Sequence, residues 1–156
     1  MRSAATKNTA WYINFKKFQG YIFKHIECNF LARVVKYDAK KHIADIQPLA
    51  NIGDGTKSAQ YLDVPVARTC YQLDELLDHF KPDYSATDSN SHLPAHTSSN
   101  FIGHYPPTKA MRVGAVVVVS VLDRDADNWD GTGKTFTPES SRTHSANDSV
   151  ITSVFL

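Results

Sequence analysis

Residues 111–129 read MRVGAVVVVSVLDRDADNW, a short apolar run that ends in a series of alternating aspartates. Valine dominates the run, and its branched side chain is stiff at χ1 and packs well in a pleated strand. Because polar residues do not alternate with apolar ones between Ala115 and Val119, we expect both faces of this strand to be buried, either in a barrel core or between subunits. The run is much shorter than the ~20 residues that span a membrane, and Asp123 ends it. The sequence therefore predicts a core strand that leads into a charged corner.

Four further segments have the composition of strands, with β-branched and aromatic residues bounded by turn-forming residues. They are residues 29–37, 42–49, 60–68 and 149–156. Ile43 and Ile46 do not alternate strictly with polar residues, which predicts a bulge or strong curvature. Pro65 cannot donate a ladder hydrogen bond, so its strand is expected at a sheet edge or a bend. Five short, curved strands favour a small β-barrel of the OB or SH3-like type, and a β-sandwich is the competing architecture.

Two segments have the periodicity of helices. Between Ala10 and Ile26 one apolar stripe, which we expect to pack against the barrel, consists of Trp11, Phe15, Phe18, Ile22 and Ile26. Residues 73–80 (LDELLDHF) predict a short second helix. Residues 81–108 are rich in Ser, Asn, His and Pro and lack periodicity, so they are either a long ordered insertion or a flexible loop.

Length and composition predict one domain of mainly β structure. We divide it into an N-terminal arm and helix, residues 1–27, and an OB-fold-like barrel, residues 28–156, with an insertion at about 70–108. The net charge of +1, from 17 basic and 16 acidic residues, provides no electrostatic case for nucleic-acid binding. Cys28 and Cys70 are too few for a disulfide framework and predict small apolar fillers in a reducing compartment. No apolar signal segment follows Met1, so we expect the protein to mature in a cytoplasm.

The aspartates of the charged corner superficially resemble a calcium-binding loop, because Asp123, Asp125 and Asp127 occupy alternate positions. An EF-hand loop requires Gly at its sixth position and a bidentate Glu at its twelfth. This chain has Asn128 and Lys134 there, which argues against calcium.

A structural role fits the spacing better, because alternate residues of an extended segment point to the same side. We predict that Arg142 or Arg124 pairs with one of three carboxylates, within one subunit or across an interface. These carboxylates belong to Asp125, Asp127 and Asp148. Trp129 ends the corner and has two equally supported roles, an anchor in a core or loop and a residue of a subunit interface.

Histidines in the 81–108 region are weak candidates for a metal site. They are His92, His96 and His104, with His79 earlier in the chain. No Cys or carboxylate lies in an obvious ligand register, so surface histidines are the favoured interpretation and we predict no metal and no cofactor. The sequence also lacks a Gly-x-Ser-x-Gly elbow, a His-Glu-x-x-His helix and a glycine-rich phosphate loop. We therefore expect no enzymatic activity.

Several of these segments together resemble the N-terminal OB-fold domain of phage tail spike proteins, the central membrane-puncturing needles of contractile tails and related baseplates. The most specific match is Asp123–Trp129, DRDADNW. The other matching elements are Ala44-Asp45-Ile46-Gln47-Pro48, Asp63-Val64-Pro65-Val66 and a late group of Arg142, His144 and Asp148. Residues 70–108 have no counterpart in the family pattern.

The resemblance implies a structural virion protein of the tail baseplate, an axial homotrimeric spike or hub-collar component that docks the central hub and tip proteins. It implies structural or interface roles for Arg124, Asp125, Asp127, Trp129, Arg142 and Asp148. Assembly in the host cytoplasm, a place in the virion, no nucleic acid and no direct membrane span are expected. Piercing is not expected to carry over, because the sequence stops at Leu156, where a spike would continue into a β-helix. The alternative is an OB-fold module that binds single-stranded nucleic acid through stacking aromatics in a positive groove, such as those of residues 11–24.

Overall fold

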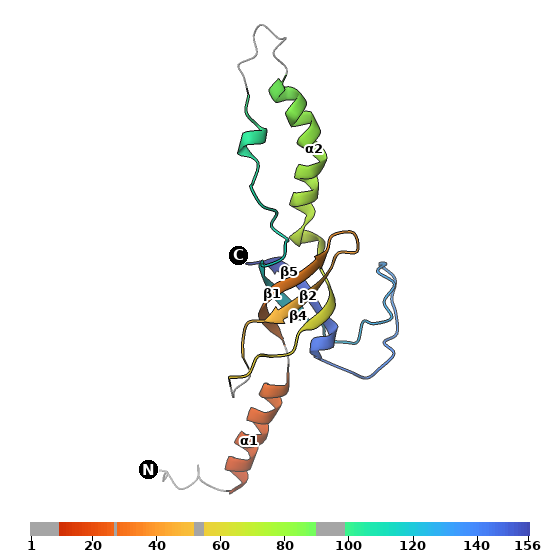
Figure 1. The fold of residues 1–156 in the computed structure, drawn as a ribbon. Helices are drawn as coiled ribbons and strands as arrows, with labels where there is room; N and C mark the ends of the chain where they lie inside the picture. Colours follow the sequence, from red (N-terminus) through yellow and green to blue (C-terminus); the bar gives the residue numbers. More distant parts are fainter. Residues whose placement is uncertain (1–9, 27, 52–54, 90–98) are drawn as a thin grey trace, which may run out of the picture. The chain divides into compact units, whose positions relative to one another are not determined.

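The computed structural model describes residues 10–26, 28–51, 55–89 and 99–156 (Figure 1). The chain divides into two compact units. One contains residues 1–29 and 121–148, and the other contains residues 30–120 and 149–156.

The second unit is built on a curled, antiparallel, five-stranded sheet with the strand order β3-β2-β1-β4-β5. The strands are β1 (Asn29–Asp38), β2 (Ile43–Pro48), β3 (Tyr61–Pro65), β4 (Val116–Val121) and β5 (Ser149–Val154). The two edges approach each other just beyond β3, where Val66 forms a parallel bridge with Ile151 and the Ala67 N–H donates to the Ile151 carbonyl at 2.8 Å. The predicted fold class, a mainly β, OB-like barrel with an N-terminal helix and a second helical region, is therefore confirmed.

The predicted irregularity of the second strand is also present. The register of the β2–β3 pair shifts between Ala44 and Ile46, and the β1–β2 pair shifts between Val34 and Lys36. Such shifts bend and twist a strand, which curls the sheet toward closure. Pro65 ends β3 at an edge of the sheet, as its missing N–H predicts.

The core lies on one face of β4. Ala115, Val117 and Val119 are fully buried and belong to the same cluster as Val34 and Ile151. The intervening residues Val116 and Val118 are only half-buried. Within the single chain the prediction of two buried faces is therefore wrong, because one sheet covers only one face of its strands, and a subunit interface on the other face stays a prediction.

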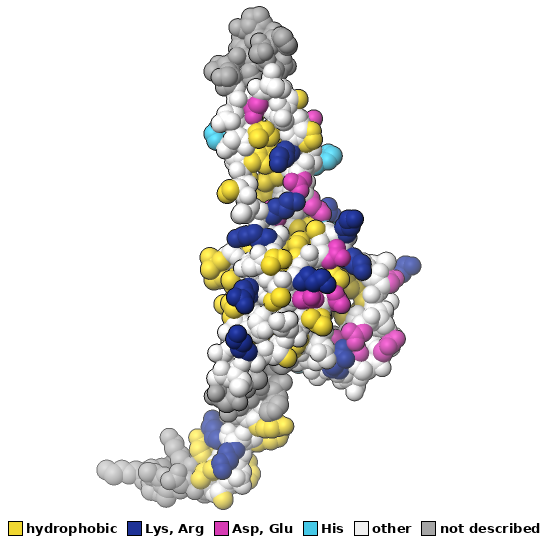
Figure 2. Space-filling model, in the orientation of Figure 1, with side chains coloured by type: hydrophobic (Ala, Val, Ile, Leu, Met, Phe, Trp, Pro, Cys, Tyr) yellow, Lys and Arg dark blue, Asp and Glu magenta, His cyan; other side chains and the backbone are white. Residues whose placement is uncertain are grey.

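The N-terminal helix α1 (Ala10–His25) has the predicted bounds within one residue. Its apolar stripe is largely exposed, with Trp11 73% and Phe18 60% exposed, and the packing of this stripe against the barrel stays a prediction. Figure 2 shows yellow apolar side chains together with dark blue Lys side chains on the visible face of this helix.

The second helix, α2 (Gln72–Ser89), is longer than predicted and continues past Pro82. Residues 81–108 lack apolar periodicity and are rich in Ser, Asn, His and Pro, which predicts an insertion or loop, but residues 81–89 belong to the helix. Contacts with the returning chain hold the second half in place. The Tyr84 ring packs on the Phe101 ring with centroids 5.3 Å apart, and Asp88 accepts hydrogen bonds from the backbone of Phe101 and Ile102 at 2.9 and 2.8 Å.

Cysteine burial follows the prediction at one position only. Cys70 is buried in the core cluster, whereas Cys28 is exposed. Position 28 lies just before the first strand and outside the core cluster formed by the described residues.

Candidate functional site

The loop of residues 123–148 carries most of the residues that support the family resemblance, and its two ends are tied together. Arg124 and Thr143 form an antiparallel bridge. The Leu122 N–H donates to the Asp148 carbonyl at 2.8 Å, and the short 3-10 helix η4 (Ala146–Asp148) precedes β5. These hydrogen bonds hold together the two ends of the long loop between β4 and β5.

Arg142 is the centre of this closure. Its Nε donates to Asp148 Oδ2 at 2.8 Å and its Nη2 donates to Asp148 Oδ1 at 2.8 Å, which is the bidentate geometry that guanidinium and carboxylate prefer. The same Nη2 also lies 2.9 Å from Asp127 Oδ2 and 3.2 Å from Asp125 Oδ1. The predicted pairing of Arg142 with one aspartate is confirmed, and the structure adds that all three aspartates share this arginine within one chain. We call these four residues the Arg142 cluster.

The carboxylates of the cluster differ in burial. The side chain of Asp148 is fully buried and that of Asp125 is 3% exposed, whereas Asp127 is open to solvent. Asp125 has further donors, the Ser140 hydroxyl at 2.5 Å and the Asp127 N–H at 3.0 Å. The buried carboxylates are thus hydrogen-bonded as well as ion-paired, which is what buried charge requires.

The surroundings stabilise the charged forms. The Arg142 guanidinium holds the pKa of Asp148 below its ordinary value, and it does so against the desolvation of that carboxyl group. The Ser140 hydroxyl, and then the Asp127 N–H, lower the pKa of Asp125. Hydrogen bonds to Asp148 and Asp127 raise the pKa of Arg142 above its ordinary value. One guanidinium among three carboxylates leaves the cluster with net negative charge.

Acid is expected to loosen the loop below about pH 4. Because the pKa values of Asp125 and Asp148 are lowered in the folded loop, the unfolded loop binds more protons between the lowered and the ordinary values. The stabilisation is therefore complete above the ordinary carboxyl pKa and is lost as the pH falls through the lowered values. Trp129 fluorescence in a Trp11→Phe variant, titrated from neutral pH downward, measures the change. Loosening that already starts near pH 6 would contradict it.

The cluster also contains the one group of three or more potential metal-ligating side chains found among the described residues. Oxygens of Asp125, Asp127 and Asp148 lie within 4.8 Å of one another. The Arg142 guanidinium bonds to each of these carboxylates, so a cation would have to displace it. The arrangement therefore serves as an ion-pair cluster.

The other predicted site residues lie close by in the same loop. Arg124 pairs with the adjacent Asp123 at 3.1 Å, and His144 lies 3.1 Å from the other oxygen of that carboxylate. Trp129 is half-exposed, and its Nε1 donates to the Thr132 carbonyl at 2.8 Å. This geometry makes Trp129 a loop anchor, and its place in a subunit interface stays a prediction.

The histidines proposed as weak metal candidates are mostly beyond what the structure describes. His92 and His96 lie outside the described residues. His104 ends the short 3-10 helix η3 (Ile102–His104).

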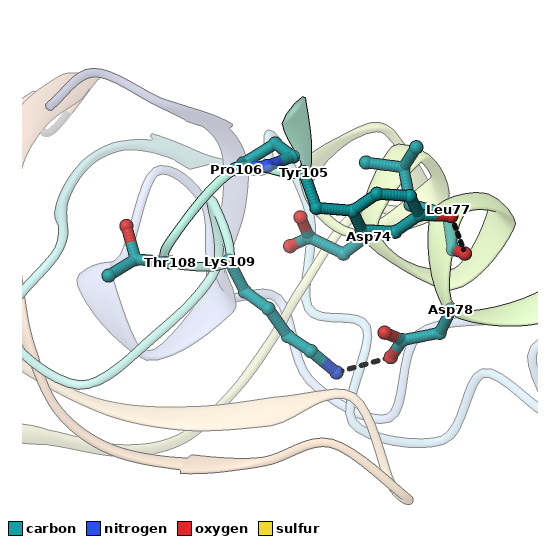
Figure 3. Close-up of a pocket in the computed structure, with 7 residues that line it drawn as sticks. All are labelled: Asp74, Leu77, Asp78, Tyr105, Pro106, Thr108 and Lys109. Carbon is teal, nitrogen blue, oxygen red and sulfur yellow. Dashed lines mark hydrogen bonds and ion pairs between the residues drawn. The ribbon is translucent and has the colours of Figure 1, made fainter. Parts of the chain in front are cut away.

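Side chains around a pocket in the first half of α2 link this helix to the chain at residues 105–111 (Figure 3). The Asp74 carboxylate accepts hydrogen bonds from the Ala110 and Met111 N–H groups, at 3.1 and 3.2 Å. Lys109 pairs with Asp78, and the Tyr105 hydroxyl donates to the Leu77 carbonyl at 2.8 Å. These bonds join the first half of α2 to residues 105–111, which indicates a structural role for this region.

Sequence reasoning missed a stacked pair of rings beside this region. The His42 and Tyr71 rings are parallel with centroids 3.9 Å apart, and His42 Nε2 lies 3.7 Å from Glu75 Oε1. His42 has a positive φ of 54°, and its Nδ1 is buried without a hydrogen-bond partner among the described residues. No local pattern signals this contact, because it joins a β-turn to residues about thirty positions away.

None of the helices in the described part of the chain combines the length and the apolar character needed to cross a bilayer. A comparison of the sequence with models of known protein families gave no match, and a comparison with curated proteins gave none either.

Proposed function

We propose that this chain is a structural virion protein of a phage tail baseplate, an axial homotrimer that acts as a spike or hub collar and docks the central hub and tip proteins. The observation that carries the proposal is the Arg142 cluster. The residues through which the chain resembles tail spike proteins, the DRDADNW run and the late Arg142 and Asp148, are the residues that meet in it. The residues that carry the sequence resemblance therefore also act together in the structure, where they hold one loop in a fixed conformation.

The cluster supports an architectural role because it stabilises a long loop in one conformation. A loop with a fixed conformation loses less entropy on assembly than a flexible one. Trp129, half-exposed and anchored through its indole nitrogen, lies in this loop and has the large rigid surface that interfaces favour.

The outer face of β4 supports a trimer. Val116 and Val118 are half-buried in the single chain, and neighbouring subunits around a threefold axis would cover them. A specific interface of ordinary size removes about 800 Å² from each partner, which is enough to include this face and its surroundings.

Native mass spectrometry of the purified chain at micromolar concentration tests the proposal. We expect a species of three times the 17.4 kDa chain mass. Trp129→Ser is expected to shift the population toward monomer, whereas Leu73→Ser, a change of an exposed apolar residue on α2, should leave the trimer intact. A chain that stays monomeric would contradict the proposal. Monomers with salt-sensitive affinity for single-stranded oligonucleotides would favour the nucleic-acid-binding alternative.

A further inference from the structure

The helix α1 has an unusual composition for a helix whose side chains are exposed. Its sequence, AWYINFKKFQGYIFKH, contains eight large apolar or aromatic residues, three lysines and no acidic residue. Trp11 and Phe15 stack with centroids 5.5 Å apart and an interplanar angle of 7°, so these two exposed rings form one apolar surface.

One sector of the helix surface is apolar and contains no lysine. At 3.6 residues per turn, Trp11, Phe15, Phe18 and Ile22 fall within a sector of roughly 60°. Lys16 and Lys17 fall on the other side, at least about 100° from the edges of this sector, and they share that side with exposed Ile13. Lys16 reaches along that side to the Gln19 amide oxygen at 3.1 Å. The helix therefore has one aromatic-rich sector, and Lys16 and Lys17 lie opposite it.

We propose that α1 binds the surface of an anionic lipid bilayer and lies in the plane of the interface. Helices that do so carry Lys or Arg on the polar face and Trp, Phe or Leu on the other. Tryptophan and tyrosine favour the boundary between head groups and acyl chains, because each ring has an apolar body and a polar atom. Lysines without acidic neighbours on the helix complement the negative charge of the lipid surface.

The length of α1 fits a helix that lies on a membrane. Sixteen residues extend about 24 Å, less than the ~30 Å of a hydrocarbon core. Helices that lie in this way bury their apolar side chains about 5–10 Å into the boundary between head groups and acyl chains.

A second copy of the chain is the less suitable occupant of this face. Helices that associate in coiled coils use aliphatic residues along the seam and pair Lys with Glu across it. The α1 seam is mostly aromatic, and its lysines have no acidic counterpart on the same helix. Exposed Tyr12 and Phe23 also extend the apolar surface beyond a narrow seam. This inference depends on α1 alone and stands apart from the proposed tail function.

Flotation of the full chain with vesicles tests the inference. Vesicles of phosphatidylcholine with about 30% phosphatidylglycerol should carry the protein, and pure phosphatidylcholine should carry much less. Replacing both lysines, Lys16→Gln with Lys17→Gln, should lower the affinity for the anionic vesicles by roughly 10- to 30-fold. Replacing the apolar face, Trp11→Ser with Phe18→Ser, should abolish flotation. The matched control, Leu73→Ser with Leu76→Ser, changes two similarly exposed apolar residues on α2 and should float as the unmodified chain does.

The two tryptophans of the chain provide a readout that locates the contact. With Trp129→Phe, the remaining Trp11 emission should shift to the blue when anionic vesicles are added. With Trp11→Phe, the remaining Trp129 emission should stay unchanged. An unshifted Trp11 emission would overturn the inference, and so would equal loss of flotation in the α2 control. If the Trp11 emission shifts to the blue as the protein concentration rises in the absence of vesicles, the helix self-associates, and this result would also overturn the inference.

Discussion

Arg142→Met is expected to lower the midpoint of thermal unfolding of the 123–148 loop by roughly 10 °C. The substitution removes the guanidinium but leaves the carboxylates of Asp148 and Asp125 in a place where water does not reach them. A buried charge without its partner is strongly destabilising, more so than the net worth of the intact pair. The loss is measured by Trp129 fluorescence during heating, in a Trp11→Phe background so that one tryptophan reports.

Three further variants separate the buried charge from other causes. Arg142→Lys keeps the charge but not the bidentate fork, so an intermediate loss is expected. Arg142→Met combined with Asp148→Asn removes both members of the bidentate pair and should recover part of the loss. Arg124→Met, the matched control, breaks an ion pair between exposed side chains and should change the midpoint little. A midpoint that is equal in Arg142→Met and Arg124→Met would contradict the role assigned to the cluster.

The cluster links the loop to the proposed assembly. If the fixed loop presents Trp129 to a neighbouring subunit, Arg142→Met should weaken the trimer without touching the interface itself. Trp129→Ser should weaken it without lowering the thermal stability of the isolated loop to the same degree. The two variants therefore distinguish a residue that shapes the loop from one that contacts a partner.

The elements predicted best from the sequence are those whose signal is local. Alternation and β-branched composition place the strands within a few residues, and the broken alternation at Ile43 and Ile46 predicts the irregular register of β2. The pairing of Arg142 with an aspartate was also within reach, because alternate residues of an extended segment share one side. The sequence does not predict that a single guanidinium pairs with three carboxylates, because this depends on how residues 125 and 148 converge in space.

The elements predicted worst depend on contacts between distant residues. The second half of α2 is held by Tyr84 and Asp88, which contact the returning chain at Ser99 and Phe101, whereas the composition of residues 81–108 lacks the periodicity of a helix. The stacked His42 and Tyr71 rings are another such contact. The apolar stripe of α1 shows a different limit, because periodicity identifies an amphipathic helix but not the surface that its apolar face meets.

Ile151→Ala is expected to lower the free energy of unfolding of the barrel by about 2–5 kcal/mol, because a fully buried side chain is replaced by a cavity. Ile151 lies where the barrel closes: it bridges to Val66, its carbonyl accepts the Ala67 N–H, and the Cys70 sulfur lies 3.8 Å from the same oxygen. Urea unfolding followed by far-ultraviolet circular dichroism measures the loss, and Ile151→Val should cost only about 0.5–1.5 kcal/mol. The matched control is Ile13→Ala on the exposed surface of α1, with an expected change within about 0.5 kcal/mol. Equal losses for Ile151→Ala and Ile13→Ala would mean that the closure at Val66 and Ile151 does not hold the barrel together.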